Sequence, residues 1–135
     1  MSRSTSHIRK DIGLLIIRIA IGTSMLAFHG IPKILRGVES WEKIGSAMHN
    51  IGITFMTPAW GFIAILTETI GSILIIIGLF TRPTAIVLAI TMLIAFISHL
   101  SKGDSFAGSS HPLELMFIFI ALAIARAGKF SIDKK

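Results

Sequence analysis

Four long apolar runs alternate with short polar segments along the chain. The runs cover about residues 11–35, 58–80, 83–100 and 112–127. An α-helix needs about 20 mainly apolar residues, at a rise of about 1.5 Å each, to cross the hydrocarbon core of a bilayer. The last run is short, so a span there requires a thin or locally packed region of the membrane. The pattern predicts an all-α integral membrane protein, a single domain over residues 1–135 built as an antiparallel bundle of four transmembrane helices.

Prolines mark the expected ends of these helices. Pro32 is expected to bend or end the first span, because proline lacks a backbone N–H and clashes with the preceding turn. Thr57 followed by Pro58 is a typical helix start, with a capping residue before a proline at the first helical position. Only residues 81–82 separate the second span from Pro83, which predicts that the second and third spans are antiparallel neighbours.

The segment between the first two spans has its own helical pattern. Within Ser40–Asn50, apolar side chains recur at helical spacing, among them Trp41, Ile44 and Met48. Such a pattern predicts a short interfacial helix with its indole at the level of the lipid head groups. We expect Trp60, near the start of the second span, to lie close to the same interface.

Composition supports a lipid environment. The 135 residues are 53% hydrophobic and 15% charged, whereas soluble domains are roughly 45–50% apolar and about 25% charged. The net charge of +6 comes mainly from residues between the runs and at the termini, where the positive-inside bias places them. We therefore expect contact with the lipid bilayer and no nucleic-acid partner. The absence of cysteine excludes disulfide exchange and thiolate metal sites within this chain.

The distribution of lysine and arginine predicts the orientation. Four spans put both termini on one side, and that side carries seven basic residues against four on the other. They are Arg3, Arg9, Lys10, Arg82, Lys129, Lys134 and Lys135 against Lys33, Arg36, Lys43 and Lys102. The side richer in Lys and Arg is cytoplasmic, so we expect a multi-pass protein of the cell's inner (plasma) membrane with both termini cytoplasmic. The first helix lacks a clear cleavage site and is expected to be retained. The tract after Ala127 is expected to be a cytoplasmic tail without a site of its own.

Two charged residues lie inside apolar runs, Arg18 in the first and Glu68 in the second. A charge at the centre of a membrane helix costs about 2.5–3.5 kcal/mol on insertion scales, so such residues face the bundle interior and have a partner. From the nearer helix ends, Arg18 lies about 10 Å deep and Glu68 about 15 Å deep. These depths allow a buried bidentate Arg18–Glu68 pair, which either passes a proton or only holds the first two helices together.

A second polar group lies toward the outer side and forms a candidate ligand pocket, with His29, Lys33, His99, His111 and Glu114 as its residues. Imidazoles and a carboxylate bind a metal, relay protons, or hydrogen-bond the carbonyl oxygens of a quinone. No local pair of histidines fixes metal geometry, so we expect no metal site. Glu114 also fits the first turn of a helix for dipole reasons alone, and His99 and His111 also fit as solvated interfacial residues.

Several tracts occur together in a recognisable order. They are LLIIRIAIG with Arg18, HGIPKI with His29 and Lys33, ETIGSILIIIGLFTR with Glu68 and Arg82, and then HPLELMF and RAGKFSID. This order, from about Asp11 to Asp133, resembles the DoxX family of small four-helix membrane proteins. The resemblance implies that Arg18, His29, Lys33, Glu68 and Arg82 are site candidates, with Arg82 at the membrane interface. It also implies links to quinol oxidase systems, quinone-coupled sulfur oxidation and oxidative-stress complexes.

Together these observations favour a small membrane subunit that supports quinone-linked electron transfer or redox homeostasis. The sequence has no ligation motif for haem, flavin or an iron–sulfur cluster, so we expect no intrinsic cofactor, a quinone as ligand, and a redox protein as partner. Whether the chain catalyses a reaction, and whether it forms a homo-oligomer, stays open at this point. The alternatives are a proton-coupled transporter or channel, and a non-catalytic scaffold for membrane assembly.

Overall fold

The computed structural model describes residues 3–134, and this part of the chain contains only helices, turns and loops. The elements, in chain order, are α1 (Arg3–Met25), the π-helical turn η1 (Leu26–Gly30), α2 (Ile31–Leu35), α3 (Glu39–Gly45), the 3-10 helix η2 (Ser46–Ile51), α4 (Thr57–Ile77), α5 (Thr81–Ser101) and α6 (Ser110–Ala125). The predicted all-helical class is therefore confirmed.

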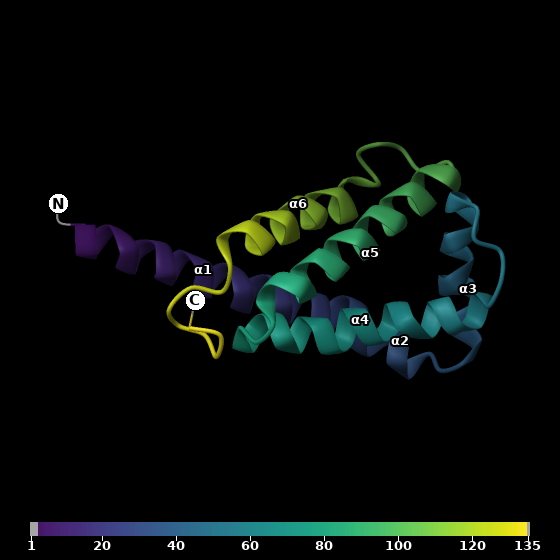
Figure 1. Cartoon of the computed structure of the whole chain (residues 1–135). Coiled ribbons are helices and arrows are strands. Elements are labelled where there is room, and N and C mark those ends of the chain that lie inside the picture. Colours follow the sequence, from purple (N-terminus) through teal and green to yellow (C-terminus); the bar gives the residue numbers. More distant parts are fainter. Residues whose placement is uncertain (1–2, 135) are drawn as a thin grey trace.

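The first three elements run on as one long helix. It covers Ser4–Leu35, or 32 residues, and its N-terminal part extends beyond the rest of the bundle (Figure 1). The helix ends at Leu35, as expected for the first span, and Pro32 lies at the start of its last part, α2. The wider turn η1 directly precedes it, and such π-turns accommodate local breaks in the α-helical hydrogen-bond pattern.

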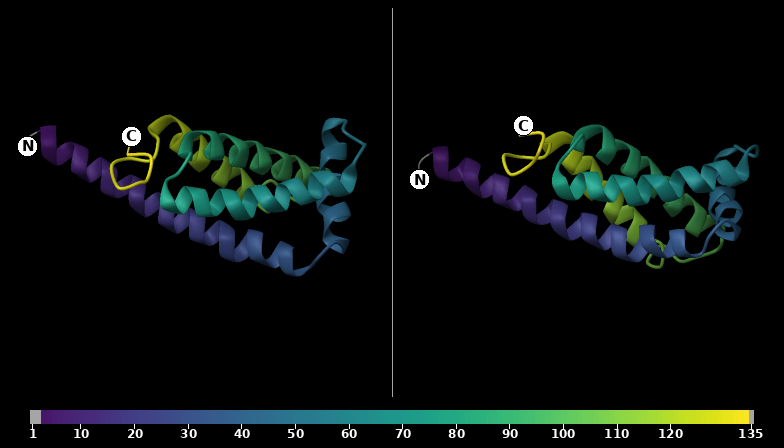
Figure 2. Two further views of the ribbon diagram at one scale, coloured as in Figure 1. Left: turned by 60° about the horizontal axis from the view of Figure 1, so that its bottom comes forward. Right: turned by 90° about the horizontal axis from the view of Figure 1, so that it is seen from below.

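The long helices lie side by side and α3 lies across one end of them (Figures 1 and 2). α4 contacts α1 and α5, and α5 contacts α6. In the described part of the chain, three helices are long and apolar enough to cross a membrane: Ser4–Leu35, α4 and α5. α6 is apolar but has only 16 residues. The four-span count and the interfacial position of α3 thus stay predictions.

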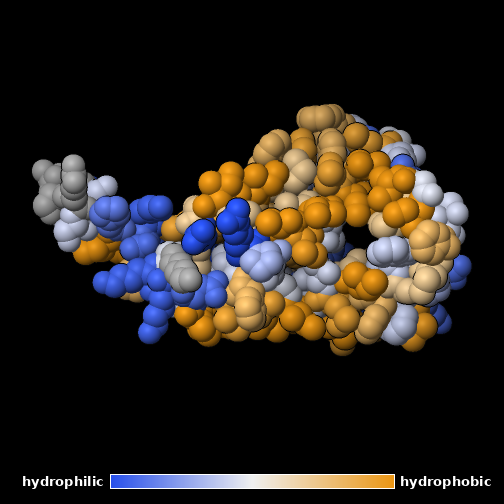
Figure 3. Space-filling model, in the orientation of Figure 1, coloured by the Kyte–Doolittle hydropathy of each residue, from blue (hydrophilic) through white to orange (hydrophobic). Residues whose placement is uncertain are grey.

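Large apolar side chains lie on the outside of the bundle as well as in its interior. Met25, Leu88 and Phe119 are fully buried between the helices, whereas Phe28 and Ile124 are 75% and 79% exposed. The space-filling view shows hydrophobic side chains over much of the bundle and hydrophilic ones near its ends (Figure 3). Large apolar side chains on an outer surface are stable against lipid tails, so these faces are in contact with lipid.

Two glycines allow α3 to cross α4 at very short range. A side chain at Gly61 of α4 would overlap the carbonyl oxygen of Trp41, and one at Gly45 of α3 would overlap that of Thr57. Beside this crossing, the ring of Trp41 packs on Phe62 with centroids 4.8 Å apart. Small residues at a crossing let two helix backbones approach closely, which fixes α3 above the start of α4.

The tract after α6 is not a free tail, contrary to the expectation. Its backbone N–H groups of Ile132 and Asp133 donate to the carbonyl oxygens of Ile77 and Gly78 at 3.2 and 2.9 Å. The N–H of Lys129 donates to the carboxylate of Asp11 at 3.1 Å. The tract therefore closes the end of the bundle at which α1 and α4 meet.

Asp133 also caps α5. Its carboxylate oxygens accept the backbone N–H groups of Phe80 and Thr81 at 3.0 and 2.9 Å. The first N–H groups of a helix lack partners within the helix, and a side-chain oxygen that accepts them stabilises its start. Phe80 itself precedes α5 and has no oxygen in its side chain, so the cap comes from the far end of the sequence.

Candidate functional site

The two charges predicted to pair are both buried but have separate partners. Arg18 and Glu68 are 1% and 2% exposed. The guanidinium of Arg18 donates to the carbonyl oxygens of Ala127, Phe130 (2.7 Å) and Ile76 (3.4 Å). The Arg18–Glu68 pair therefore does not form. Backbone carbonyls that follow the end of α6 have no partner within a helix, and they attract the guanidinium instead.

Glu68 forms its ion pair with Lys33. The ammonium group of Lys33, from α2, donates to Oε2 of Glu68 in the middle of α4. Only 3% of the Glu68 side chain is exposed, against 22% for Lys33. A buried carboxylate requires a charged, hydrogen-bonding partner. Lys33 is therefore the partner of Glu68, and it lies near the C-terminal end of the long first helix, whereas Arg18 lies earlier, in α1.

The turn η1 brings a histidine to the same place. Gly30 lies so close to α4 that a side chain there would come within 2.8 Å of the Thr69 hydroxyl. His29, one residue earlier, lies about one helical turn before Lys33 in the continuous helix Ser4–Leu35. Its Nε2 lies 3.2 Å from Nε2 of His111 on α6, and the two rings stack with centroids 5.4 Å apart. Polar groups therefore follow one another from exposed His111, through half-buried His29, to the Lys33–Glu68 pair.

A pocket of about 300 Å³ lies against this ion pair, enclosed by α3, η2, α4 and α5. Its walls are mainly aliphatic, with Ile63, Ile90 and Ile94 among them, and Trp60 also lines it. Figure 3 shows a hollow over these elements, near the end at which α3 lies. Apolar walls with a few convergent polar groups, in a volume of roughly 300 Å³ or more, are typical of small-molecule sites.

The other predicted pocket residues lie elsewhere. His99, at the end of α5, has its Nδ1 2.6 Å from a carboxylate oxygen of Asp104, and both side chains are 46% exposed. Glu114 is exposed on α6. Of the five residues predicted for the pocket, Lys33 lines it, whereas His29, His99, His111 and Glu114 do not. Hydropathy gives the depth of a residue in the bundle but not the direction it faces, and His99 and Glu114 are exposed outside the pocket.

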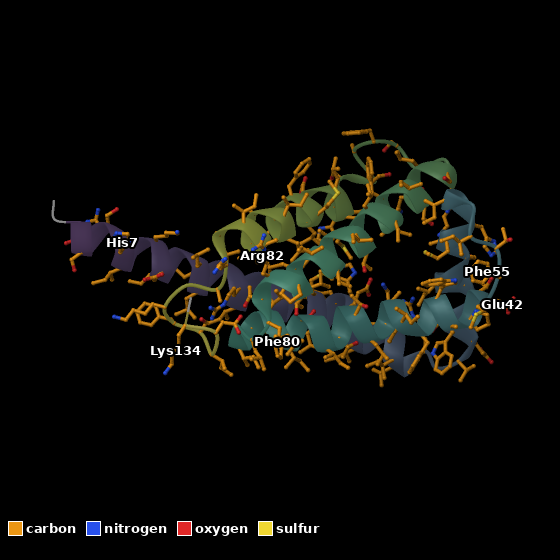
Figure 4. The ribbon with its side chains drawn as sticks, viewed as in Figure 1. His7, Glu42, Phe55, Phe80, Arg82 and Lys134 are labelled. Atoms are coloured by element: carbon orange, nitrogen blue, oxygen red, sulfur yellow. The ribbon has the colours of Figure 1, made fainter. Side chains whose placement is uncertain are left out.

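The predicted interface residues lie at the two ends of the bundle. Arg82 is at the end that also holds the closing tract, and Glu42 and Phe55 mark the opposite end (Figure 4). Trp41 and Trp60 belong to α3 and α4 at that opposite end. Trp41 contacts Phe62, whereas Trp60 lines the pocket and donates its indole N–H to the carbonyl oxygen of Phe55 at 3.1 Å.

Thr91 was not among the residues predicted for the pocket, although the sequence contains a signal for it. Glu68 lies 12 residues before Phe80, and Thr91 lies 11 residues after it. Antiparallel helices joined by a short turn place such positions at the same level, and both residues line the pocket. In the described part of the chain, no three histidine, aspartate or glutamate side chains gather as metal ligands.

The site can act on a ligand by hydrogen bonding and proton exchange. Lys33 supplies an ammonium donor, Glu68 a carboxylate acceptor, and the imidazoles of His29 and His111 lead toward the surface. Inside an apolar site such groups interact strongly with a ligand, because water does not screen them.

Comparison with known proteins identifies the family of the chain. The family model of DoxX matches residues 13–100, which include Arg18, His29, Lys33 and Glu68. The match ends within α5, so the tracts of α6 and the closing segment lie outside it. No match was found among curated proteins or among solved structures. The family match covers more than half of the sequence and includes both residues of the buried ion pair: the chain belongs to the DoxX family.

Proposed function

We propose that this DoxX-family membrane protein binds a quinone in the pocket beside Lys33 and Glu68, and that it supports quinone-linked electron transfer. The observation that carries the proposal is a buried ion pair at the wall of an otherwise apolar pocket of about 300 Å³. A quinone has two carbonyl oxygens on a flat apolar ring, usually with an apolar tail. Lys33 is placed to donate to a carbonyl oxygen, and Glu68 to accept from the hydroxyl of the quinol.

The pocket walls fit the rest of such a molecule. Ile63 and Ile90 line the pocket and are also exposed on the membrane-facing surface, so an apolar tail extends from the pocket into lipid. Ile94 and Trp60 offer contact area for the ring. Burial of apolar surface contributes roughly 25 cal/mol per Å², so these walls supply affinity while the ion pair supplies orientation.

Reduction of a quinone to a quinol takes up two electrons and two protons. We infer that the protons pass from His111 through His29 to Glu68, because His29 contacts His111 and lies about one helical turn before Lys33, the partner of Glu68. The electrons come from a partner protein with its own redox cofactor. In the proposed arrangement the chain spans the plasma membrane with both termini cytoplasmic, and the pocket lies toward the outer side.

The geometry favours binding over transport across the membrane. Glu68 and Arg18 are separated along the bundle by the fully buried apolar side chains of Met25, Ile75 and Leu88. Ser72 is a buried polar residue between the two sites, but its hydroxyl donates to the carbonyl oxygen of Glu68, and in the described part of the chain no side-chain hydrogen bond continues from it to Arg18. A proton-coupled transporter needs such a path or a second arrangement of the helices.

Tryptophan fluorescence tests the proposal, because only one of the two indoles lines the pocket. A quinone with a short tail is titrated into purified protein in nanodiscs. Saturable quenching is expected in the wild type and in Trp41→Phe, and it is lost in Trp60→Phe. Glu68→Gln and Lys33→Met are expected to raise the dissociation constant about 10-fold or more, since hydrogen bonds to charged groups contribute about 1.5–3 kcal/mol.

Other outcomes contradict the proposal. Linear quenching that is equal for both indoles would mean collision in the lipid, not a site. Proton flux in liposomes that stops with Glu68→Gln would favour transport. A double substitution, Lys33→Met with Glu68→Met, that preserves function in cells would favour a scaffold, since apolar replacement of a buried pair is often neutral for folding.

A further inference from the structure

A second groove lies on the surface between α5 and α6, with a volume of about 520 Å³. Aliphatic side chains line most of its length, among them Ile86, Leu93 and Ile120. Two arginines, Arg82 and Arg126, lie at the end of the groove nearest the closing tract. Figure 4 shows Arg82 at this end of the bundle, and Figure 3 shows hydrophilic surface there beside the apolar bundle.

The same two arginines border a second cavity of about 340 Å³, which is lined also by Thr81 and Asp133. Arg82 and Arg126 therefore lie between the apolar groove and a cavity of mixed polar and apolar lining. Both residues are exposed. Among the described residues, neither guanidinium has a hydrogen-bond or ion-pair partner, whereas the carboxylate of Asp133 accepts the N–H groups at the start of α5.

The backbone of Arg126 is strained. Its φ of 65° and ψ of −169° lie in a region that only glycine adopts readily. Glycine at this position would remove the strain, and the next glycine is only two residues away in the sequence. Strained backbone persists where the surrounding structure imposes it and is concentrated at functional sites. An unpartnered guanidinium beside Arg82 gives this residue a use that glycine would not have.

We propose that Arg82 and Arg126 bind the phosphodiester of an anionic phospholipid, with an acyl chain along the groove between α5 and α6. Guanidinium groups form strong, often bidentate hydrogen bonds with phosphate oxygens. Basic sites between transmembrane helices at a membrane surface are suited to anionic head groups. The hydroxyl of Thr81 and the carboxylate of Asp133 in the adjacent cavity then receive the uncharged part of the head group, such as glycerol hydroxyls.

The two arginines at the end of the groove favour a lipid, and not a packed protein helix, as the molecule that occupies it. An apolar helix seated in the groove would cover Arg82 and Arg126 and bring no counter-charge of its own, and buried unpaired charges are strongly destabilising. A phospholipid fills the apolar groove and neutralises the arginines with one molecule. The site is separate from the quinone pocket: Ile90 contributes to the walls of both, but the charged groups of the two sites differ.

Native mass spectrometry of the full chain in detergent tests this inference. The protein is titrated with phosphatidylglycerol and, separately, with phosphatidylcholine of the same acyl chains. We expect the anionic lipid to bind at least about 10-fold more tightly. Arg82→Gln and Arg126→Gly are expected to remove this preference, while Arg36→Gln, an exposed arginine at the other end of the bundle, keeps it.

Arg126→Gly separates lipid binding from folding. Because glycine relieves the strained backbone, the variant is expected to have an unfolding temperature equal to or above that of the wild type while its lipid preference falls. Equal binding of both lipids by the wild type, or an undiminished preference in Arg126→Gly, would overturn the inference. A dimer that Arg126→Gly dissociates, without selective lipid binding, would also overturn it and assign the groove to a second copy of the chain.

Discussion

At the scale of single residues, Arg18 binds backbone carbonyls where a carboxylate partner is the usual expectation. Its acceptors at Ala127 and Phe130 belong to the closing tract, and its acceptor at Ile76 belongs to the last turn of α4. In the low-dielectric interior, each unsatisfied polar backbone group costs several kcal/mol. One guanidinium therefore satisfies carbonyls of two segments and attaches the tract to the bundle. Its Nε atom is buried and has no partner in the described part of the chain.

Arg18→Met is expected to destabilise the protein by about 3 kcal/mol or more, because the carbonyls at Ala127 and Phe130 lose a charged donor. Thermal unfolding in detergent measures the loss, and limited trypsin digestion locates it. Cleavage after Lys129 is expected to accelerate, since the tract is released. Arg36→Met removes an exposed guanidinium by the same chemistry and serves as the control. Equal sensitivity of the two variants would contradict the role given to Arg18.

The sequence identified the charged residues that matter but not which of them pair. Arg18, His29 and Lys33 share one stripe of the first helix, and Glu68 lies at a depth that suited Arg18. Lys33 was the nearer choice, because the end of the first span and the start of the second meet at the same end of the bundle. Every residue carries a backbone carbonyl oxygen, so the sequence does not show which of them accept hydrogen bonds from Arg18.

At the scale of elements, α3 and η2, which cross the start of α4, form one wall of the pocket (its roof). Ile44 and Met48, from α3 and η2, line it above the α4 residues. Gly61 sets the distance between the two helices, because its missing side chain makes room for the carbonyl oxygen of Trp41. The pocket therefore depends on a backbone contact as well as on the residues that line it.

Gly61→Ala is expected to cost about 1–3 kcal/mol, the usual range for overpacking, and to weaken binding of the quinone in the same titration. Gly71→Ala is a matched control in the same helix. Its new methyl group would lie 3.4 Å from the side chain of Leu88, a flexible neighbour. This control gains helix propensity worth up to about 1 kcal/mol, so its stability is expected to be unchanged or higher. Binding that survives Gly61→Ala would show that α3 is not the roof of the site.

The apolar runs predicted the positions of the long helices well, whereas the segments between and after them were predicted less well. The expected spans 58–80 and 83–100 coincide with α4 (Thr57–Ile77) and α5 (Thr81–Ser101) to within three residues. The end of the first helix at Leu35 was predicted, but the turn η1 was not, because it involves only backbone hydrogen bonds. The closing tract was missed for a related reason: short polar segments look alike whether they are solvated or packed.

At the scale of the whole molecule, the closing tract joins the first and last parts of the chain. The hydrogen bond from Lys129 to Asp11 places the segment after α6 beside α1, and Asp133 caps α5 from the same end. His7 and Lys134 lie toward this end, and Glu42 and Phe55 lie at the other (Figure 4). An arrangement with both termini at one end fits four crossings of the membrane, provided that the 16-residue α6 spans it as well.

Thiol labelling can decide the number and direction of the crossings, because the natural chain has no cysteine. Single substitutions Lys10→Cys and Lys134→Cys report on one end of the bundle, and Glu42→Cys and Lys102→Cys on the other. A charged maleimide that does not cross membranes is expected to label only the last two variants in intact cells, since the end richer in Lys and Arg is cytoplasmic. The first two should react after permeabilisation. Labelling of Lys134→Cys together with Lys102→Cys in intact cells would mean three crossings, with α6 lying outside the membrane. It would also be incompatible with the bond between Lys129 and Asp11, because that bond requires both residues on the same side.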